Sequence, residues 1–416
     1  MATVPKTMSI GPLSIYSTAG KQKFSVACEP KDAWTDAERK SIAWIAQFSG
    51  RSPVQLTTTG ESVTVEIPRS KMITSLTLTT SLPSSDIKGV QSIAIVDIAT
   101  RPYPPLTSPI ADANIVETSV VRRGGNRRRF SAQVDGISFA LGLNSPAVSS
   151  TGVGMSGPAE GPRFVSDAFA DRYGHWVNLL DVTTAVEGGA SFAATNTYDA
   201  GKLSYGLLQF ASHTPNRNMV ELLRLWMARA DAPMYFPEFS LEDVNGTQRI
   251  CDLAGNPLED DASTAALCNV LNPNPNAIDK AECKFLARLI HLSRFDPTTC
   301  DDQVRLGVSY FKQHLATFSG KAIEGRPDYI CAVVADVMNQ GRHEPGEAPA
   351  DSIRKCLLNG DQPIPDDQVF RQLLAIGRKT YGGRIKSLKT RIAELMKAGR
   401  LGARIYSNGV FVVPGS

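Results

Sequence analysis

Residues 1 to about 120 alternate between hydrophobic and polar positions. The alternation is clearest in Val63–Ile67 and in Ile73–Thr79, where the threonines suit half-exposed strands. A more continuous apolar run, Ser92–Ile98, predicts a buried strand. One helix is expected among these strands, because Thr35-Asp36-Ala37-Glu38 has the form of a capping box. This part of the chain is therefore predicted to be rich in β-structure.

From Phe164 onward, apolar residues return every three or four positions, which is the spacing of one helix face. A further helix, rich in lysine and arginine, is expected over Gln368–Lys397 with a break at Gly382–Gly383, and a short strand at Gly409–Val413 follows it. The pattern predicts the other helices over Phe164–Glu187, Met219–Ala230, Ala281–Arg294, Asp302–Phe318 and Tyr329–Gln340.

The change of pattern predicts two domains in an α+β, multidomain protein. A chain of 416 residues is long for a single ordinary core. Residues 144–163 are small, polar and poor in packing material, which is typical of a linker. We therefore expect a β-rich accessory domain at 1–143 and a mainly α-helical domain at 164–416. An insertion is expected near residues 240–280 of the second domain.

The net charge and the hydropathy of the chain exclude few classes of protein. The formal net charge is +3, so the overall charge indicates no partner. The chain contains no apolar run approaching the roughly 20 residues that span a bilayer, which predicts no membrane span. The first residues, Met1–Lys6, lack the charged start and apolar core of a secretion signal, which predicts synthesis in the cytoplasm without a signal peptide.

The seven cysteines do not predict a metal site. They form no Cys-x-x-Cys pair and no histidine stands at zinc-finger spacing, so neither a metal nor another cofactor is expected. Disulfides and buried reduced thiols remain equally open.

Arginines form the one strong charge cluster. Gly124 to Asn126 predicts a tight turn between two strands, which would place the five arginines on one hairpin. A solvated basic hairpin is one interpretation, and contact with a polyanion such as wall phosphate, lipopolysaccharide or nucleic acid is the other. The arginines are Arg122, Arg123, Arg127, Arg128 and Arg129.

A series of three short motifs carries the candidate chemistry. Glu187-Gly188-Gly189 ends a predicted helix, Asn196 to Asp199 forms a polar loop, and Ser204 to Phe210 reads Ser-Tyr-Gly-Leu-Leu-Gln-Phe. The series resembles the lysozyme-like superfamily of phage endolysins, lytic transglycosylases and chitosanases. In that superfamily the catalytic glutamate ends a helix, and a polar hairpin and a Gly-Leu-(Leu/Met)-Gln segment follow. The resemblance covers residues 165 to 340, less than half of the chain.

The resemblance implies a glycosidase in which Glu187 is the general acid. Partial burial beside apolar residues would raise the pKa of its carboxyl group, so that it keeps its proton near neutral pH. Asp199 is the candidate second carboxylate, and a turn aspartate that caps its own backbone is the alternative. A carboxylate gap of roughly 6.5–9.5 Å would favour inversion, and about 5 Å retention. Without Asp199 as a base, the enzyme would be a lytic transglycosylase.

Further residues of the series would complete the cleft. Ser204 occupies the place of a small hydroxyl near the attacking water, and Gln209 matches the glutamine of the family segment. Asn196, Tyr198 and Tyr205 are candidate substrate-binding residues in the wall of the sugar groove. Asp336, in a later apolar helix, is expected to pair with an arginine.

The sequence thus predicts a bacteriolytic glycosidase of muramidase type, acting as an endolysin or a secreted antibacterial effector on peptidoglycan. It would reach the periplasm or cell wall after lysis, through a holin or by an export machine, with a possible immunity or delivery protein as partner. One alternative is a chitosanase- or chitinase-type enzyme of the same fold. The other is a non-catalytic glycan-binding structural protein of a phage or secretion system.

Overall fold

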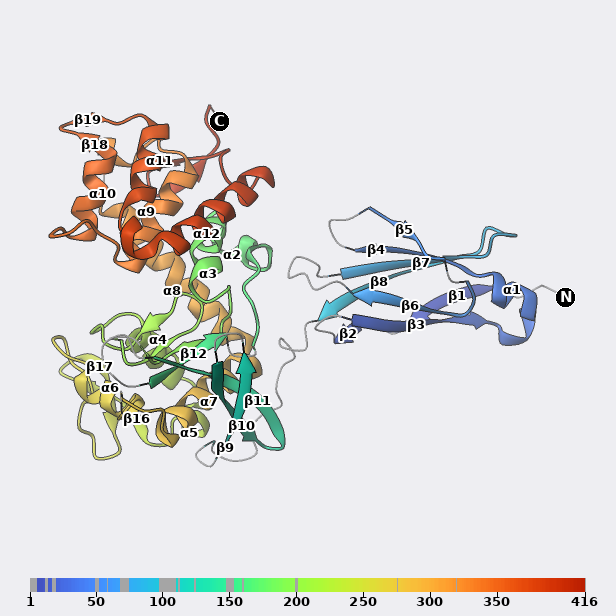
Figure 1. The fold of residues 1–416 in the computed structure, drawn as a ribbon, viewed down its shortest axis with the longest axis horizontal. Coiled ribbons are helices and arrows are strands. Elements are labelled where there is room, and N and C mark those ends of the chain that lie inside the picture. The colour runs from blue at the N-terminus through green and yellow to red at the C-terminus, as the bar shows by residue number, and fades with distance from the viewer. Residues whose placement is uncertain are drawn as a thin grey trace. The chain divides into compact units, whose positions relative to one another are not determined.

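The chain folds into two compact units, Met1–Arg101 and Pro102–Ser416 (Figure 1). The computed structural model describes residues 6–11, 14–16, 20–48, 52–57, 59–67, 75–96, 110, 113–122, 125–146, 153–158, 161–198, 201–274, 276–318 and 320–415. The mixture of helices and mainly antiparallel sheets confirms the α+β class.

The predicted boundary at residues 144–163 is wrong. Strands β11 (Ile137–Pro146) and β12 (Val153–Pro158) bring both ends of that segment into one sheet, where Asn144 pairs with Met155. Gly154, one of the small residues of this segment, serves close packing. A Cβ on Gly154 would lie 2.5 Å from the Cα of Tyr198, so a larger side chain would collide with backbone there.

The first unit is built from two sheets that share one core. Alternation of buried and exposed positions, as in Trp44 and Ala46 of β4, gives each sheet an inward apolar face. One sheet holds the antiparallel strands β1 (Thr7–Gly11), β3 (Gly20–Glu29) and β6 (Ser62–Ile67). The other holds β2 (Ser14–Tyr16), β8 (Lys88–Val96), β7 (Ser75–Ser81), β4 (Ala43–Phe48) and β5 (Val54–Gln55), in that order.

The capping box predicted in the first unit is present. Thr35 Oγ1 accepts a hydrogen bond from the backbone N–H of Glu38, and the Glu38 carboxylate accepts one from the N–H of Thr35. The helix that begins there, α1 (Asp36–Ser41), is short, and the apolar residues after it form β4. Their burial in the sheet core decides this outcome over helix propensity.

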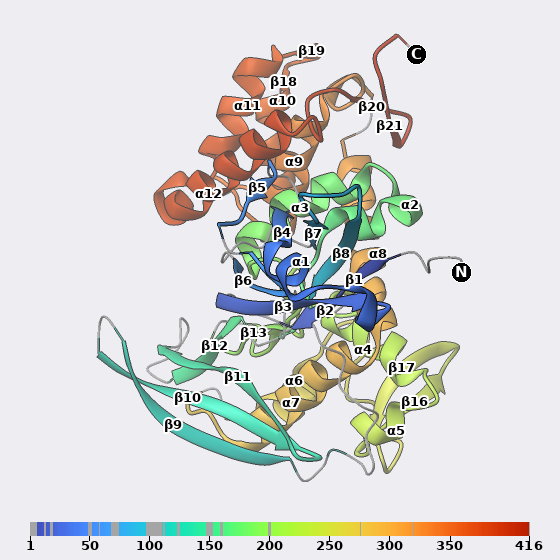
Figure 2. The same cartoon turned by 90° about the vertical axis from the view of Figure 1, so that its right-hand side faces the viewer.

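The second unit contains a seven-stranded antiparallel sheet. Helix α7 (Lys280–Phe295) packs on the three strands of this sheet that come first in the chain, β9 (Asn114–Arg122), β10 (Gly125–Val134) and β11. This contact explains why nearly every apolar residue of α7 is buried. Figure 2 shows the long curved ribbon of these strands with α7 beside it. The strand order is β15 (Phe210–Ala211), β14 (Ser204–Tyr205), β13 (Ala194–Asn196), β12, β11, β10 (Gly125–Val134) and β9 (Asn114–Arg122).

Helices gather around α3, which ends at the candidate acid. Helix α3 (Trp176–Glu187) contacts α8 (Pro297–Ala316), α9 (Asp328–Gln340) and α12 (Arg378–Lys397). In Figure 1, α8 runs between this group and the strands and helices of the other end of the unit. Other helices of this unit are α2 (Ala170–Tyr173), α4 (Met219–Met227), α5 (Ala232–Tyr235), α10 (Pro349–Leu357) and α11 (Asp366–Ala375).

The basic C-terminal helix is interrupted twice. Gly377, with φ of 68°, separates α11 from α12, and Tyr381 leaves helical geometry within α12. The kink thus lies one residue before the predicted break at Gly382–Gly383. Two small hairpins complete this region, formed by β18 (Leu358–Asn359) with β19 (Gln362–Pro363) and by β20 (Ile405–Ser407) with β21 (Val410–Val412).

The segment near residues 240–280 is partly built into the core. It forms the hairpin of β16 (Phe239–Val244) and β17 (Thr247–Asp252) and helix α6 (Ala265–Leu271). The buried Glu259 carboxylate binds both Arg224 of α4 and Arg249 of β17. These ion pairs fasten the segment to the rest of the unit.

Candidate functional site

Glu187 is the last residue of α3, as the sequence predicts. The helix is anchored by residues with almost no exposure, such as Leu180 and Val182, so its C-terminal end is held firmly. Gly188 follows because space is lacking: a Cβ there would lie 2.6 Å from the Cβ of Ala194 in β13. The side chain of Glu187 is 13% exposed.

Two arginines and a second carboxylate surround Glu187. Arg384 of α12 places Nη2 2.9 Å from Glu187 Oε1 and 2.6 Å from Asp336 Oδ1. Arg342, which follows α9, binds Asp336 Oδ2 at 2.7 Å. Asp336 and Arg342 are fully buried. The pairing of Asp336 with an arginine is confirmed, and the cluster ties α3, α9 and α12 together.

Sequence analysis missed the ion pair of Glu187. Arg384 lies almost two hundred residues later, in a helix whose many basic residues gave no sign of which one turns inward. The pair bears directly on the acid role, because a neighbouring cation favours the ionised carboxylate.

Burial outweighs the cation in setting the pKa of Glu187. Loss of hydration raises this pKa, Arg384 lowers it, and the negative charge of Asp336 raises it again. The result is a pKa of about 7, above the ordinary value of 4.5. Because Arg384 is shared with Asp336, its charge is divided between two carboxylates. A substantial fraction of Glu187 is therefore protonated at neutral pH.

The second and third motifs are brought beside the end of α3. Ser204 and Tyr205 form β14, which pairs with β13 on one side and β15 on the other. Gln209 has a φ of 53° and donates from Nε2 to the carbonyls of Ala194 and Gly206, both at 3.1 Å. A Cβ on Gly188 would lie 3.7 Å from this same Nε2. The structure therefore assembles Glu187-Gly188 and Gln209 in one place.

Two of the predicted site residues are packed into the interior. Tyr205 has no exposed surface, and its hydroxyl bonds to the Leu289 carbonyl and to Ser293 Oγ, both at 2.8 Å. It therefore packs the sheet against α7 and has no surface to offer a sugar. Ser204 is also buried, with 3% exposure. Gln209 is partly exposed, and its amide N–H groups hold the turn that carries it.

Gln303 of α8 is a second residue that sequence analysis missed. Its Oε1 accepts a hydrogen bond from the N–H of Leu207 at 2.8 Å, and its Nε2 donates to the Phe192 carbonyl at 3.1 Å. Gly206, with φ of 80°, is required at this contact, since a Cβ would stand 2.2 Å from Gln303 Oε1. One buried amide thus joins both arms of the hairpin to the helix.

The polar loop after β13 is held from two sides. Thr197 donates its N–H to the Met155 carbonyl at 2.9 Å, and its hydroxyl accepts from the Met155 N–H at 2.7 Å. The same hydroxyl donates to the buried carboxyl group of Glu282 in α7. Asn196 and Tyr198 flank this anchor, and Asn196 Oδ1 accepts from the Tyr198 N–H. Asp199 lies outside the described residues.

Glu282 itself has a perturbed pKa. Burial raises it from 4.5 to about 7, while the Thr197 hydroxyl opposes this shift by a hydrogen bond and nearby Asp279 adds to it.

The arginine cluster does form a hairpin. Arg122 pairs with Gly125 at the closed end of β9 and β10. Arg127 and Arg129 are exposed, whereas Arg128 points to the other face and pairs with Glu117 at 3.3 Å. The side chains of Arg122 and Arg123 lie outside the described residues.

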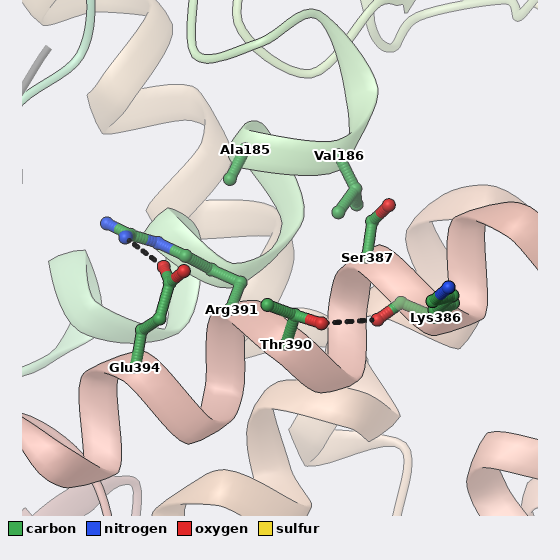
Figure 3. A pocket seen from close by; sticks show the side chains of 7 residues that line it. All are labelled: Ala185, Val186, Lys386, Ser387, Thr390, Arg391 and Glu394. Carbon is green, nitrogen blue, oxygen red and sulfur yellow. Dashed lines mark hydrogen bonds and ion pairs between the residues drawn. The ribbon is translucent and has the colours of Figure 1, made fainter. Parts of the chain in front are cut away.

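A hollow of about 480 Å³ lies between α3 and α12, directly before Glu187. Figure 3 shows Ala185 and Val186 of α3 facing polar side chains of α12 across it. The α12 residues are Lys386, Ser387, Thr390, Arg391 and Glu394.

Metal and membrane features are not found in the described part of the chain. No group of three or more His, Cys, Asp or Glu side chains there could hold a metal ion. All seven cysteines are free thiols, six of them buried, which decides between the two states left open above. Among the helices of the described ranges, none is both long and apolar enough to cross a bilayer.

Comparison with known proteins adds no relative. No protein-family model matches this sequence, and a search of curated proteins returns no match.

Proposed function

We propose that this protein is a bacteriolytic glycosidase that cleaves the glycan strands of peptidoglycan with Glu187 as general acid. One observation carries the proposal: Glu187 ends a helix, its carboxyl group has a pKa of about 7, and the next residue, Gly188, lies beside the turn that holds Gln209. A protonated carboxyl near neutral pH is what protonation of a glycosidic oxygen requires.

Glu187 would transfer its proton to the bridging oxygen as the bond between the sugar carbon and that oxygen breaks. The electron pair of the bond goes to the leaving oxygen, and positive charge develops on the sugar ring. Glu187 is then a carboxylate, and Arg384 at 2.9 Å stabilises this charge. The arginine thus favours the state after proton transfer, whereas burial keeps the proton in place beforehand.

The second half of the reaction depends on the loop after β13. With Asp199 as base, a water would attack and the product would be a reducing sugar. Without such a base, a hydroxyl of the same sugar would attack and leave an anhydro end, as in a lytic transglycosylase. The anchored Thr197 supports the loop in either case.

The ion pair of Glu187 favours a second candidate function. A carboxylate held by Arg384 is a weaker acid donor than a free one, which suits a domain that binds glycan without cutting it. The first unit would then be a delivery or wall-binding module of a structural protein. Cleavage products distinguish the two functions.

The test compares wild-type protein with Glu187→Gln on purified bacterial sacculi. We expect the variant to be at least about 100-fold slower in reducing turbidity, since general acid catalysis contributes about that much or more. Glu242→Gln, at an exposed position of β16, is the control for the same change elsewhere. Thermal melting of each variant shows that it is folded, and analysis of released fragments for anhydro ends separates hydrolysis from transglycosylation.

Full lysis by folded Glu187→Gln would remove the acid assignment. Binding of sacculi without any released fragment, by wild-type protein, would establish the second candidate.

A further inference from the structure

Lysines on α12 occupy the exposed side of the helix, whereas two of its arginines, Arg384 and Arg391, turn inward. Lys386, Lys389 and Lys397 are exposed, and none of the described acidic side chains forms an ion pair with them. Arg384 and Arg391 of the same helix bind Asp336 and Asp181, respectively. The intervals of 3 residues (Lys386 to Lys389) and 8 residues (Lys389 to Lys397) place the three lysines along one side of the helix.

The hollow between α3 and α12 runs beside this line of lysines. Lys386 belongs to both, as Figure 3 shows. Its floor is apolar, from Ala185 and Val186, and its wall carries the hydroxyl groups of Ser387 and Thr390. Among the charged side chains that line the hollow, Arg391 pairs with Glu394 at 2.9 Å, and Lys386 is in no ion pair with a described acidic residue.

The hollow adjoins the proposed acid along both helices. Val186 directly precedes Glu187, and Ser387 lies one helical turn after Arg384, the partner of Glu187. A volume of about 480 Å³ is in the range of small-ligand pockets, roughly 300–1,000 Å³. A substituent on a glycan bound at Glu187 would therefore fall within reach of the hollow.

We infer that the hollow and the lysines of α12 bind the carboxylate-bearing peptide substituents of the glycan. This inference rests on the proposed function and names its substrate class. In peptidoglycan, every muramic acid bears a lactyl group and a peptide with carboxylates, which recur along the strand. Chitin lacks such groups, and chitosan carries amines that the lysines would repel. The apolar floor suits small side chains of such a substituent. The hydroxyl groups of Ser387 and Thr390 donate to backbone carbonyls of α12, so they can accept hydrogen bonds from the N–H groups of its peptide backbone.

The first experiment measures binding, independently of turnover. The Glu187→Gln protein and its Lys386→Glu/Lys389→Glu derivative are sedimented with sacculi from a Gram-negative bacterium, which lack teichoic phosphates. We expect the derivative to bind on the order of tenfold more weakly at low salt, since an exposed charge contact contributes up to about fivefold. The difference should shrink as salt rises, because ions screen exposed charges.

Two controls identify the carboxylates. Lys321→Glu, an exposed lysine outside α12, should leave binding within about twofold of the parent, as expected for a surface charge without a contact. Sacculi whose carboxyl groups have been amidated should bind the parent as weakly as untreated sacculi bind the double variant. Equal loss in Lys321→Glu, or unchanged binding to amidated sacculi, would overturn the inference.

The second experiment compares substrates for the otherwise wild-type enzyme. The double lysine variant should lose activity on sacculi but not on glycol chitin, an uncharged soluble glycan, and an equal loss on both contradicts the inference. If wild-type protein cuts neither glycan, the proposed catalytic function fails. The sedimentation result still decides whether these lysines bind the peptide carboxylates.

Discussion

At the scale of single residues, Glu187 combines two opposing influences that come from different helices. Burial at the end of α3 raises its pKa, and Arg384 of α12 lowers it. Asp336 competes for the same guanidinium group at 2.6 Å. A change at Arg384, which does not itself transfer a proton, should therefore change the pKa of Glu187.

Arg384→Gln should therefore shift the pH dependence of cleavage. The acid must be protonated, so activity of the wild-type protein should fall as pH rises through about 7. Removing the cation removes the influence that lowers the pKa, and the falling limb should move to higher pH. The rate on sacculi as a function of pH measures this shift. A limb that moves to lower pH, or stays in place, would contradict the role assigned to Arg384.

Glu282 offers a prediction for stability rather than activity. Its pKa in the fold is about 7 against an ordinary 4.5, so the folded state binds its proton more tightly. The stability that this group contributes is fully present below pH 4.5 and is lost as pH rises through about 7. Glu282→Gln should retain the hydrogen bond from Thr197 and be more stable than the wild type at pH 8, by on the order of 3 kcal/mol.

Denaturant unfolding at pH 4 and pH 8 checks this prediction. The difference between wild type and Glu282→Gln should appear at pH 8 and nearly vanish at pH 4, with Glu242→Gln as control. A variant that is less stable at pH 8 would show that the ionised carboxylate, not the protonated form, is the stable state.

The sequence predicts the position of residues that belong to a short local pattern. It does not predict the contacts of residues that meet only in the folded chain. The helix end at Glu187 and the capping box at Thr35 follow from short patterns, and the structure has both. Tyr205 sits in a motif that matched a sugar-binding wall, yet α7 covers it. Arg384 and Gln303 come from helices distant in sequence, so no local pattern indicated them.

At the scale of elements, close approach of backbones shapes the site. Strand β12 approaches the loop after β13 so closely that only glycine fits at position 154. The low packing content of this stretch suggested a linker, because a sequence does not reveal whether a small residue is exposed or compressed. The sheet register supplies that information.

Two glycine substitutions should therefore have opposite effects. Gly154→Ala would force its Cβ to within 2.7 Å of three backbone atoms of Thr197 and Tyr198, and should cost about 1–3 kcal/mol, as overpacking does. Gly383→Ala, in α12, meets nothing within 4 Å and should stabilise by about 0.5–1 kcal/mol through helix propensity. Midpoints of denaturant unfolding measure both. A neutral Gly154→Ala would show that the loop readily yields.

At the scale of the whole molecule, two separate cores hold the chain together. The first gathers residues such as Trp44 and Leu78, and the second extends from the sheet through α8 to the C-terminal hairpin. The division between the two units falls at Arg101–Pro102, before the arginine hairpin in the sequence. The hairpin belongs to the unit that contains Glu187.

Calorimetry should accordingly resolve two unfolding transitions. Removal of residues 1–101 should delete one transition and leave the melting temperature of the other within a few degrees, because a change of about 1 kcal/mol shifts a large domain by only about 2–4 °C. Loss of both transitions on truncation would show that the units depend on each other for folding.

The seven-stranded sheet joins the arginine hairpin to the turn at Gln209 without a break in hydrogen bonding. Arg127 and Arg129 lie on β10, five strand steps from β15, so at about 4.8 Å per step roughly 24 Å separates them from β15 along the sheet. A polyanion gripped by Arg127 and Arg129 would therefore be held at a fixed offset from the scissile position. The sheet would thus fix the distance between the polyanion bound at these arginines and the position at which the glycan is cut.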